Sequence, residues 1–417
     1  MICFHGKIKE PTGQKIQMQR SYLKNKSVQK DVQSFIEFGF GYLAVLLTGL
    51  FLARYINQHL TIEDMGKYSF TSSWVMILAP FLYFSAPQAY LRFHDEHTIS
   101  RKLRNFLMPF FWFSTVALAA IIYKFTSSWI AMLYALTPML TEKLYLLRSK
   151  MLITRLNILQ ITSQLVPLAL MFYFCREHEL NANIVLAFYG VGYALSIFFP
   201  GGEYTNNSIE KSKILHFLWP TIFTTLLSMF LANSAVLFAK YYFGYESAGV
   251  MGVAVKAMTT VSSIFSFFLM FFPIIYMREA AKGNYKLIRI YRRFITAAAL
   301  AGCIIFAIFY KFIYYLLGAE KYYDHAYLFI ILIAVAFCNF LADIYWLYFS
   351  FEIKTWKNAL LKGMSCLIVI AGISFTPRFG INYIVYLLLA AAAIPSLVGM
   401  IMALAAENKY LRMKGNI

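Results

Sequence analysis

Long apolar segments recur along the whole chain, and this pattern constrains the fold more than any other feature. A helix needs about 20 mostly apolar residues to cross the hydrocarbon core of a bilayer. Backbone groups in lipid must be hydrogen-bonded within the protein, so these segments are expected to be helices. We predict spans at 34–56, 68–91, 105–123, 128–147, 152–174, 182–200, 214–239, 248–277, 294–317, 325–349, 358–376 and 382–406. The expected fold is therefore an all-α polytopic membrane protein of twelve transmembrane helices.

The composition agrees with this class and argues against others. Of the 417 residues, 60% are hydrophobic and only 14% are charged, whereas about 25% are charged in a soluble domain. The net charge of +19 lies mainly in short loops between the apolar spans, so we do not interpret it as a nucleic-acid-binding surface. Cysteines without paired spacing are expected to be free thiols: Cys3, Cys175, Cys303, Cys338 and Cys366.

Basic residues are concentrated in alternate loops, which predicts the orientation of the chain. A cytoplasmic N-terminus places most of the 38 Lys and Arg residues inside, including those of the 282–293 run KGNYKLIRIYRR. Residues 1–33 are polar and contain no apolar region of a cleavable signal peptide. We therefore expect a multi-pass membrane protein with both termini in the cytoplasm.

A weak internal repeat divides the chain into two halves of the same orientation. Glu63-Asp64-Met65-Gly66 begins one span as Glu246-Ser247-Ala248-Gly249 begins another. Each of these spans ends in a proline followed by an arginine, Pro87 with Arg92 and Pro273 with Arg278. Parallel repeats are a transporter architecture with the site between the halves. The expected organisation is a tail (1–33), a six-helix bundle (34–200), a linker (201–213), a second pseudo-symmetric six-helix bundle (214–406) and a tail (407–417).

Lys256 is the only full charge in the thirty residues 248–277, AGVMGVAVKAMTTVSSIFSFFLMFFPIIYM, which are otherwise largely apolar. A lysine at the centre of a membrane helix costs about 2.5–3.5 kcal/mol on insertion scales. At helical spacing it shares a face with Thr259, Thr260 and Ser263, which is typical of a helix lining a polar cavity. The alternative is a lysine that extends to the membrane surface, but this leaves the Thr/Ser stripe unexplained.

Other polar residues lie at membrane depth on other predicted helices. Glu37 and Thr48 share a face of the first span, and Arg54 stands near its outer end. Asn233 and Asp343 lie in the seventh and tenth spans. The two acids are candidates for binding a coupling H⁺ or Na⁺, with a structural ion pair as the alternative. We prefer Glu37, because Asp343 is followed by bulky aromatic residues and is expected to be packed.

Two further groups of polar residues are expected to be structural. Asn157, Gln160 and Gln164 recur at helical spacing in the fifth span, where helix packing is the favoured interpretation. Glu142 and Lys143, near the inner end of the fourth span, are expected to be interfacial.

Signatures of enzymes and cofactors are weak or missing in the sequence. His94-Asp95-Glu96-His97 has a metal-ligand spacing without a nearby third ligand, and there is no Walker A or GxSxG motif. External loops are short, which disfavours a membrane glycan polymerase or ligase. We expect no catalytic residues, no metal and no cofactor.

Three segments together resemble the Wzx-type polysaccharide flippases, of the superfamily that includes lipid II flippases and MATE drug exporters. They are SFIEFGFGYLAVLLTGLFLARYI, LTIEDMGKYSFTSSWVMILAPFLYFSAPQAYLRF and YESAGVMGVAVKAMTTVSSIFSFFLMFFPIIYMRE. The resemblance implies two six-helix bundles around a cationic cavity that alternates between inward- and outward-open. It also implies transport of undecaprenyl-pyrophosphate-linked oligosaccharide units, for O-antigen, capsule or a related glycan, from the inner to the outer leaflet of the bacterial plasma (inner) membrane.

Under this resemblance the substrate pyrophosphate is the expected partner of the cavity cations. Lys256 and Arg54 would bind it within the cavity, and Arg92 and Arg278 would capture it at the inner rim. The polar wall for the sugar would comprise Thr259, Thr260, Ser263, Asn233 and Thr48. Membrane lipid and the glycan polymerase machinery are the other expected partners. The alternative function is a MATE-like, cation-coupled exporter of small organic molecules.

Overall fold

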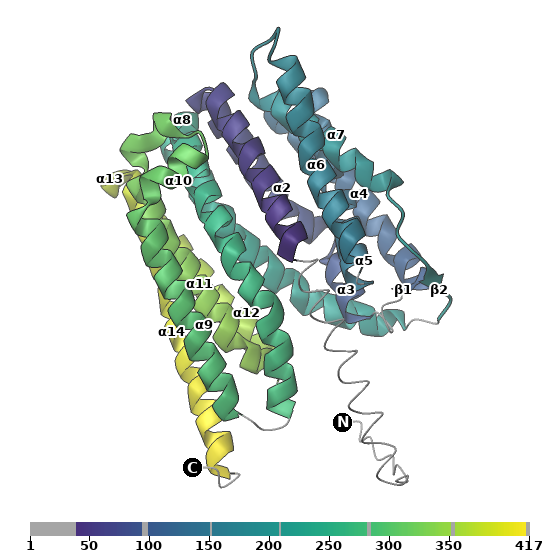
Figure 1. Ribbon diagram of the computed structural model, residues 1–417, viewed down its shortest axis with the longest axis vertical. Coiled ribbons are helices and arrows are strands. Elements are labelled where there is room, and N and C mark those ends of the chain that lie inside the picture. Colours follow the sequence, from purple (N-terminus) through teal and green to yellow (C-terminus); the bar gives the residue numbers. More distant parts are fainter. Residues whose placement is uncertain are drawn as a thin grey trace.

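The computed structural model describes residues 39–93, 99–150, 152–207, 210–281, 285–351 and 355–413. Helices dominate these residues, and the bundle is long in the direction of the helix axes (Figure 1). The first half comprises a first helix (Gly39–His59), α2 (Ile62–Leu82), α3 (Ala86–Arg92), α4 (Arg101–Thr126), η1 (Ile130–Leu136), α5 (Thr137–Ser149), α6 (Ile153–Phe174) and α7 (Ala182–Phe198). The second comprises α8 (Lys211–Ala281), α9 (Tyr285–Ile308), α10 (Tyr310–Leu316), η2 (Glu320–His325), α11 (Tyr327–Phe351), α12 (Thr355–Ile373), α13 (Thr376–Phe379) and α14 (Ile381–Met413).

The helices of the described residues account for the predicted spans. Nine of them are long and apolar enough to cross a membrane. The α2–α3 pair, bent by 58°, adds a tenth, and α7 is a shorter apolar helix. Gly244 divides α8 into two spans, because its φ of 89° is a conformation that favours glycine. The expectation of a helical membrane protein in two bundles is confirmed.

The second span begins earlier than the expected residue 68. Thr61 caps α2 by accepting a hydrogen bond from the Asp64 backbone N–H, and Glu63 and Asp64 occupy the first turn. Acidic side chains at this position interact favourably with the positive end of the helix dipole. The residues Glu63 and Asp64, which were expected to begin the span, therefore belong to the first turn of the helix.

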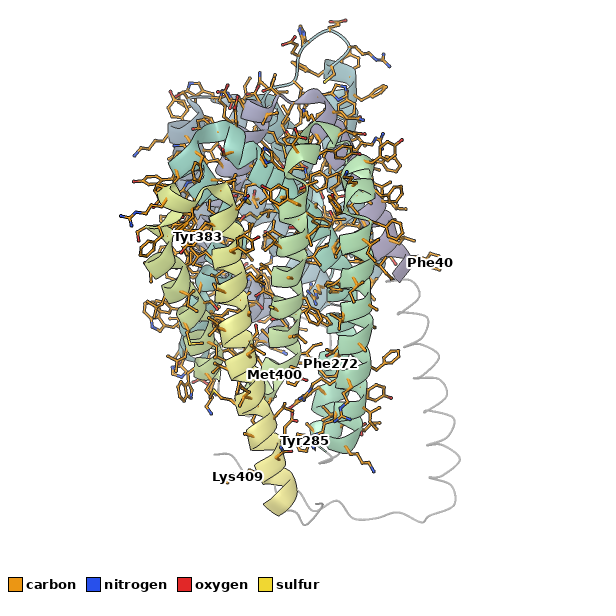
Figure 2. All side chains as sticks on the ribbon, turned by 90° about the vertical axis from the view of Figure 1, so that its left-hand side faces the viewer. Phe40, Phe272, Tyr285, Tyr383, Met400 and Lys409 are labelled. Carbon is orange, nitrogen blue, oxygen red and sulfur yellow. The ribbon has the colours of Figure 1, made fainter. Side chains whose placement is uncertain are left out.

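The outer surface of the bundle is apolar. In the first helix Phe40, Leu43, Leu47 and Phe51 are 72%, 50%, 46% and 63% exposed and recur every three or four residues. Phe40 is labelled at the edge of the bundle in Figure 2. Such a stripe on one helical face is expected where the helix contacts lipid.

The two halves meet at the upper end of the molecule in Figure 1, where the two parts of α8 join and α10 lies. The amide of Asn57 donates to the carbonyl of Leu317 at 2.9 Å, and Lys321 donates to the carbonyl of Leu60. At the lower end, β1 (Ile99–Ser100) pairs in parallel with β2 (Tyr204–Thr205). This pairing ties the segment that precedes α8 to the first half.

Candidate functional site

Close packing of α2 against α8 joins the halves above Lys256. A Cβ atom on Gly66 would lie 1.8 Å from the carbonyl oxygen of Tyr245, and one on Gly249 would lie 2.3 Å from that of Ile62. A Cβ on Gly252 would lie 2.2 Å from Oγ of Ser69. The glycines on the face of Lys256 therefore serve helix contact, because a side chain at these positions would separate the backbones.

A cavity of about 200 Å³ lies next to this contact and is lined by both halves. The first helix contributes Tyr42, Val45, Leu46, Gly49, Leu50 and Ala53, α6 contributes Gln164, and α8 contributes Lys256, Thr259, Thr260 and Ser263. The hydroxyl of Tyr42 donates to the carbonyl of Ser263 at 2.5 Å, which links the first helix to α8. The structure thus brings four of the predicted residues together on one cavity wall.

The ammonium of Lys256 is buried and, among the described residues, has no hydrogen-bond partner. Its nearest aromatic contact is the ring of Tyr68, with Nζ 5.6 Å from the centroid. Oε1 of Gln164, on the other half, is likewise buried without a partner in the described part of the chain. Because buried polar groups are nearly always hydrogen-bonded, an unsatisfied donor and acceptor in one cavity indicate a site for a small polar group.

The hydroxyls on the α8 wall all donate to carbonyls one turn earlier in their own helix. Thr259 donates to Val255 at 2.7 Å, Thr260 to Lys256 at 3.0 Å and Ser263 to Thr259 at 2.9 Å. This bonding satisfies their donors locally and leaves oxygen lone pairs to accept. The wall can therefore accept hydrogen bonds from a ligand rich in hydroxyl groups.

The other predicted cations do not join Lys256 in the cavity. Arg54 faces a separate pocket, and its Nη1 donates to the carbonyl of Tyr315 at 3.2 Å. Arg92 is exposed at the end of α3. Arg278 lies in α8, but its side chain falls outside the described residues, as does Glu37.

The predicted polar residues Thr48 and Asn233 do not line the cavity either. Thr48 donates to Ala44 at 2.8 Å and Asn233 to Met229 at 2.9 Å, each within its own helix. Asp343, which was expected to be packed, is exposed on α11, whereas Trp346 and Tyr348 nearby are buried. The bulky residues point into the bundle and leave the carboxylate side of α11 accessible.

Tyr42 and Gln164 were not predicted as site residues. The fifth span was expected to serve packing, and it does so at Asn157, whose Nδ2 would lie 1.7 Å from a Cβ on Gly41. Gln164 packs beside Gly49 and also lines the cavity. The sequence signal for Gln164 was its helical spacing from Asn157. This periodicity shows that the two residues share a face of α6, but it does not show which helix packs against that face.

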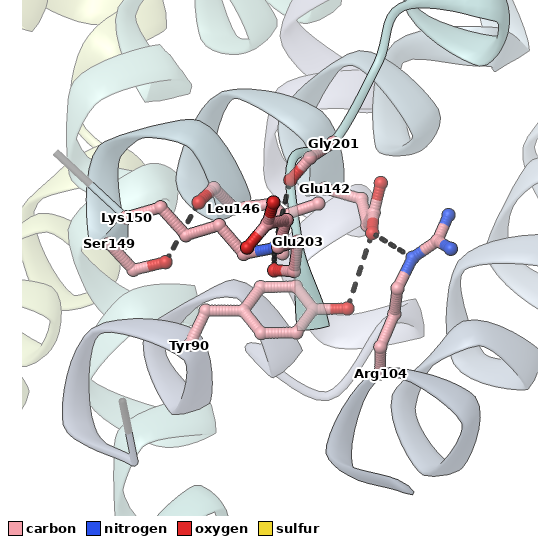
Figure 3. A network of polar contacts seen from close by, with 8 residues as sticks. All are labelled: Tyr90, Arg104, Glu142, Leu146, Ser149, Lys150, Gly201 and Glu203. Atoms are coloured by element: carbon pink, nitrogen blue, oxygen red, sulfur yellow. Dashed lines mark hydrogen bonds and ion pairs between the residues drawn. The ribbon is translucent and has the colours of Figure 1, made fainter. Parts of the chain in front are cut away.

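Buried charge clusters at the lower end were also missed. Glu142, expected to be interfacial, is 2% exposed; it accepts from the hydroxyl of Tyr90 and Nε of Arg104, both at 3.3 Å (Figure 3). Lys150 donates to the carbonyls of Gly201 and Glu203 in the same network. These contacts hold α3, α4, α5 and the segment before α8 together.

Metal binding finds no support within the described ranges. They contain no group of three His, Cys, Asp or Glu side chains able to hold a metal ion. His94 and His97, whose spacing is that of metal ligands but which lack a nearby third ligand in the sequence, lie outside the described residues.

Among comparisons with known proteins, only the comparison with solved structures finds matches, and these identify the fold of the chain. No family model matches the sequence, and no curated protein matches it. Among solved structures, an inward-facing multidrug resistance MATE family transporter of the MOP superfamily matches with a TM-score of 0.68 and 12% identity, over 89% of this chain and 96% of that one. An outward-facing MATE transporter matches with a TM-score of 0.65 and 12% identity, over 91% and 96%.

A third structure is described as a MOP superfamily transporter from Pyrococcus furiosus whose reverse polarity of the binding pocket suggests a different function. It matches with a TM-score of 0.61 and 11% identity, over 91% of this chain and 95% of that one. The structural matches define the class: a multi-pass membrane protein with the MATE transporter fold, twelve helices in two bundles.

Proposed function

We propose that the protein is a flippase that moves undecaprenyl-pyrophosphate-linked oligosaccharide units across the bacterial plasma membrane by alternating access. The observation that carries the proposal is the buried ammonium of Lys256, which has no hydrogen-bond partner in the described part of the chain. A desolvated cation favours an anionic ligand, and bonds between Lys and phosphate are among the stronger ones available.

Among the described residues, Lys256 is the one charged residue that lines the cavity, and this supports a phosphate as the group bound beside it. Pyrophosphate oxygens would accept from Lys256, while sugar hydroxyls would donate to Gln164 and to the threonines of α8. One structure with the same fold, from the MOP superfamily, is described as having a binding pocket of reverse polarity. This description supports the idea that the charge of the pocket varies among proteins of this fold.

The contacts between the halves support one orientation of the transport cycle. The halves are joined at the upper end by Asn57 and Leu317, and the basic-loop pattern assigns this end to the outside. In this proposal the structure represents an inward-facing state with both termini cytoplasmic. Arg92 and Arg278 would then lie at the cytoplasmic rim, with Glu37 or Asp343 as the H⁺ or Na⁺ site.

A second candidate is a cation-coupled exporter of small organic molecules. One specific observation favours it: the side chain of Asp343 is exposed on α11 and belongs to none of the ion pairs formed among the described residues, although the charge of Lys362 on α12 lies near enough to interact with it. An acid is the group that an organic cation requires. The two candidates differ in which residue binds substrate, Lys256 or Asp343.

The test is flipping of a fluorescent, nitrobenzoxadiazole-labelled polyprenyl pyrophosphate in proteoliposomes, read by dithionite quenching. Lys256→Ala should lower the rate about tenfold or more, and Lys256→Arg should retain part of it because the charge remains. Lys240→Ala is the matched control, because Lys240 lies on the same helix beside Phe70 and Tyr245, away from the cavity. Unchanged flipping by Lys256→Ala would overturn the proposal.

The second candidate has its own test in the same proteoliposomes. Transport of an organic cation that is lost in Asp343→Asn but kept in Lys256→Ala would establish it.

A further inference from the structure

A second pocket opens on the lipid-facing surface of the first half, between the first helix and α6. It has a volume of about 640 Å³ and is lined mainly by Phe51, Tyr55, Leu165, Leu168, Ala169 and Phe172. Phe51 and Phe172 are 63% and 57% exposed, so the pocket opens where lipid-facing side chains lie. We call it the lateral groove. It is distinct from the Lys256 cavity, since it shares no lining residue with it.

Arg54 and Gln58 are the polar residues of the lateral groove. Arginine has five N–H donors, and within the described residues the only hydrogen bond of the Arg54 side chain is from Nη1 to the carbonyl of Tyr315, at 3.2 Å. Its guanidinium carbon also lies 5.3 Å from the ring centroid of Tyr315. The side chain is therefore held in place while most of its donors stay available.

A second cation lies at the same end of the groove. The guanidinium carbon of Arg176 lies 5.4 Å from the ring centroid of Phe172. None of the ion pairs formed among the described residues includes Arg54 or Arg176. The lateral groove is thus apolar along most of its length and has cations at its upper end.

We propose that the lateral groove binds an anionic phospholipid, with one acyl chain along the groove and the phosphate on Arg54. The lateral groove spans residues 51–58 and 165–172, which correspond to a rise of about 11 Å in each helix. This length fits the upper part of one chain in a leaflet about 15 Å deep. Two other occupants fit less well. Free phosphate would not fill the apolar part of the lateral groove, and a neutral lipid would bring no anion to the guanidinium of Arg54.

The same arginine connects lipid binding to the conformation of the protein. Tyr315 belongs to α10 in the second half, so Arg54 is held by this contact when the halves meet at the upper end. A ligand shifts a conformational equilibrium by its difference in affinity for the two states. Bound anionic lipid should therefore stabilise the conformation in which the halves are joined here.

The test uses native mass spectrometry of the full-length protein in detergent, titrated with dioleoylphosphatidylglycerol or dioleoylphosphatidylcholine. We expect the parent protein to bind the anionic lipid about tenfold or more tightly than the zwitterionic one. Arg54→Gln should remove this preference without changing phosphatidylcholine binding, and Arg54→Lys should retain part of it. Lys311→Gln, an exposed lysine on α10, is the matched control.

Two results would overturn the assignment. Equal binding of the two lipids by the parent, or an unchanged preference in Arg54→Gln, would show that Arg54 does not recognise the headgroup. Displacement of phosphatidylglycerol by one equivalent of undecaprenyl phosphate would assign the groove to the polyprenyl carrier instead. Failure here leaves the Lys256 proposal untouched, because the two sites share no residue.

Discussion

Arg292 and Glu407 form a buried ion pair that joins α9 to α14. Nη2 of Arg292 lies 2.6 Å from Oε1 of Glu407, and the two side chains are 2% and 0% exposed. The hydroxyl of Tyr276 donates to the same oxygen at 3.5 Å. Nε of Arg289 lies 3.9 Å from the other carboxylate oxygen, so two cations and a phenol surround Glu407 at the lower end of the second half.

The first half contains a related cluster. Tyr90, three residues after Pro87, donates to Glu142, as Tyr276, three residues after Pro273, donates to Glu407. An arginine of the next helix completes each cluster, Arg104 in α4 and Arg292 in α9. The two glutamates lie at different places in their halves: Glu142 is in α5, and Glu407 is in α14. The two clusters therefore place the tyrosine and the arginine alike but take the glutamate from helices that do not correspond.

Glu407→Gln should destabilise the protein strongly, because it leaves the Arg292 charge buried without a counter-ion. Breaking a buried pair in this way costs about 3–5 kcal/mol. The measurement is thermal unfolding of the detergent-solubilised protein. Glu210→Gln is the control: Glu210 and Lys213 form an exposed pair, and such pairs contribute about 0–1 kcal/mol. Equal losses in both variants would contradict the structural role of the buried pair.

Gly249→Ala should separate the halves at the upper end, because its Cβ would lie 2.3 Å from the carbonyl oxygen of Ile62. Overpacking of this kind costs about 1–3 kcal/mol and here falls on the contact between α2 and α8. Spin labels on Lys124 and Lys311 should report a longer distance in the variant. Gly363→Ala is the control, since a Cβ atom at this position of α12 would meet no neighbouring atom within 4 Å. An unchanged distance in Gly249→Ala would mean that the helices adjust without moving apart.

Lys150 gives a prediction of pH dependence. Burial, with Arg104 and Lys143 nearby, lowers the pKa of this lysine from 10.5 to about 8. Between about pH 8 and 10.5 the unfolded chain binds more protons at this residue than the folded one, so its contribution to stability rises with pH. The melting temperature of the parent relative to Lys150→Met should therefore increase across this window. Lys213→Met controls for the loss of a lysine; a falling difference would contradict the lowered pKa.

The number and type of helices could be predicted because hydropathy is a local property. Lys256 could be identified for the same reason, since a single charge in an apolar helix has few explanations, and its Thr/Ser stripe follows from helical spacing. Sequence alone does not give which helices face one another. The presence of Gln164 and Lys256 in one cavity, and the separation of Arg54 from this cavity, depend on such pairings.

Burial of charge could not be predicted for similar reasons. Glu142 was expected at the membrane surface because it lies next to Lys143 near the inner end of the fourth span. Its partners Tyr90 and Arg104 come from α3 and α4, and only the tertiary fold brings them together. The exposure of Asp343 was likewise missed, because bulky neighbours in sequence point to a different face of the helix.

Both termini should be cytoplasmic, as the concentration of basic residues in alternate loops predicts. A reporter that is active only outside the cytoplasm should be silent after Ile417 and active when fused at Asn181, in the turn between α6 and α7. Lys124 and Lys311 lie at the same end as Asn181 and should be accessible to an impermeant amine reagent in intact cells. Activity of the fusion after Ile417 would contradict an even number of spans.

Coupling to an ion gradient should depend on an acid at membrane depth, and exposure on α11 now makes Asp343 the candidate to test beside Glu37. An outward-moving anionic headgroup is already helped by an inside-negative potential, by about 2.3 kcal/mol per charge per 100 mV. Coupling is then needed mainly to reset the empty carrier, in which a carboxylate loses and regains H⁺ or Na⁺. In proteoliposomes, the variant that removes the coupling acid, Asp343→Asn or Glu37→Gln, should flip the labelled polyprenyl pyrophosphate at equilibrium but no longer respond to an imposed pH or Na⁺ gradient. The other variant should respond as the parent does, which makes each the control for the other. A parent protein that responds to neither gradient would exclude coupling by either ion.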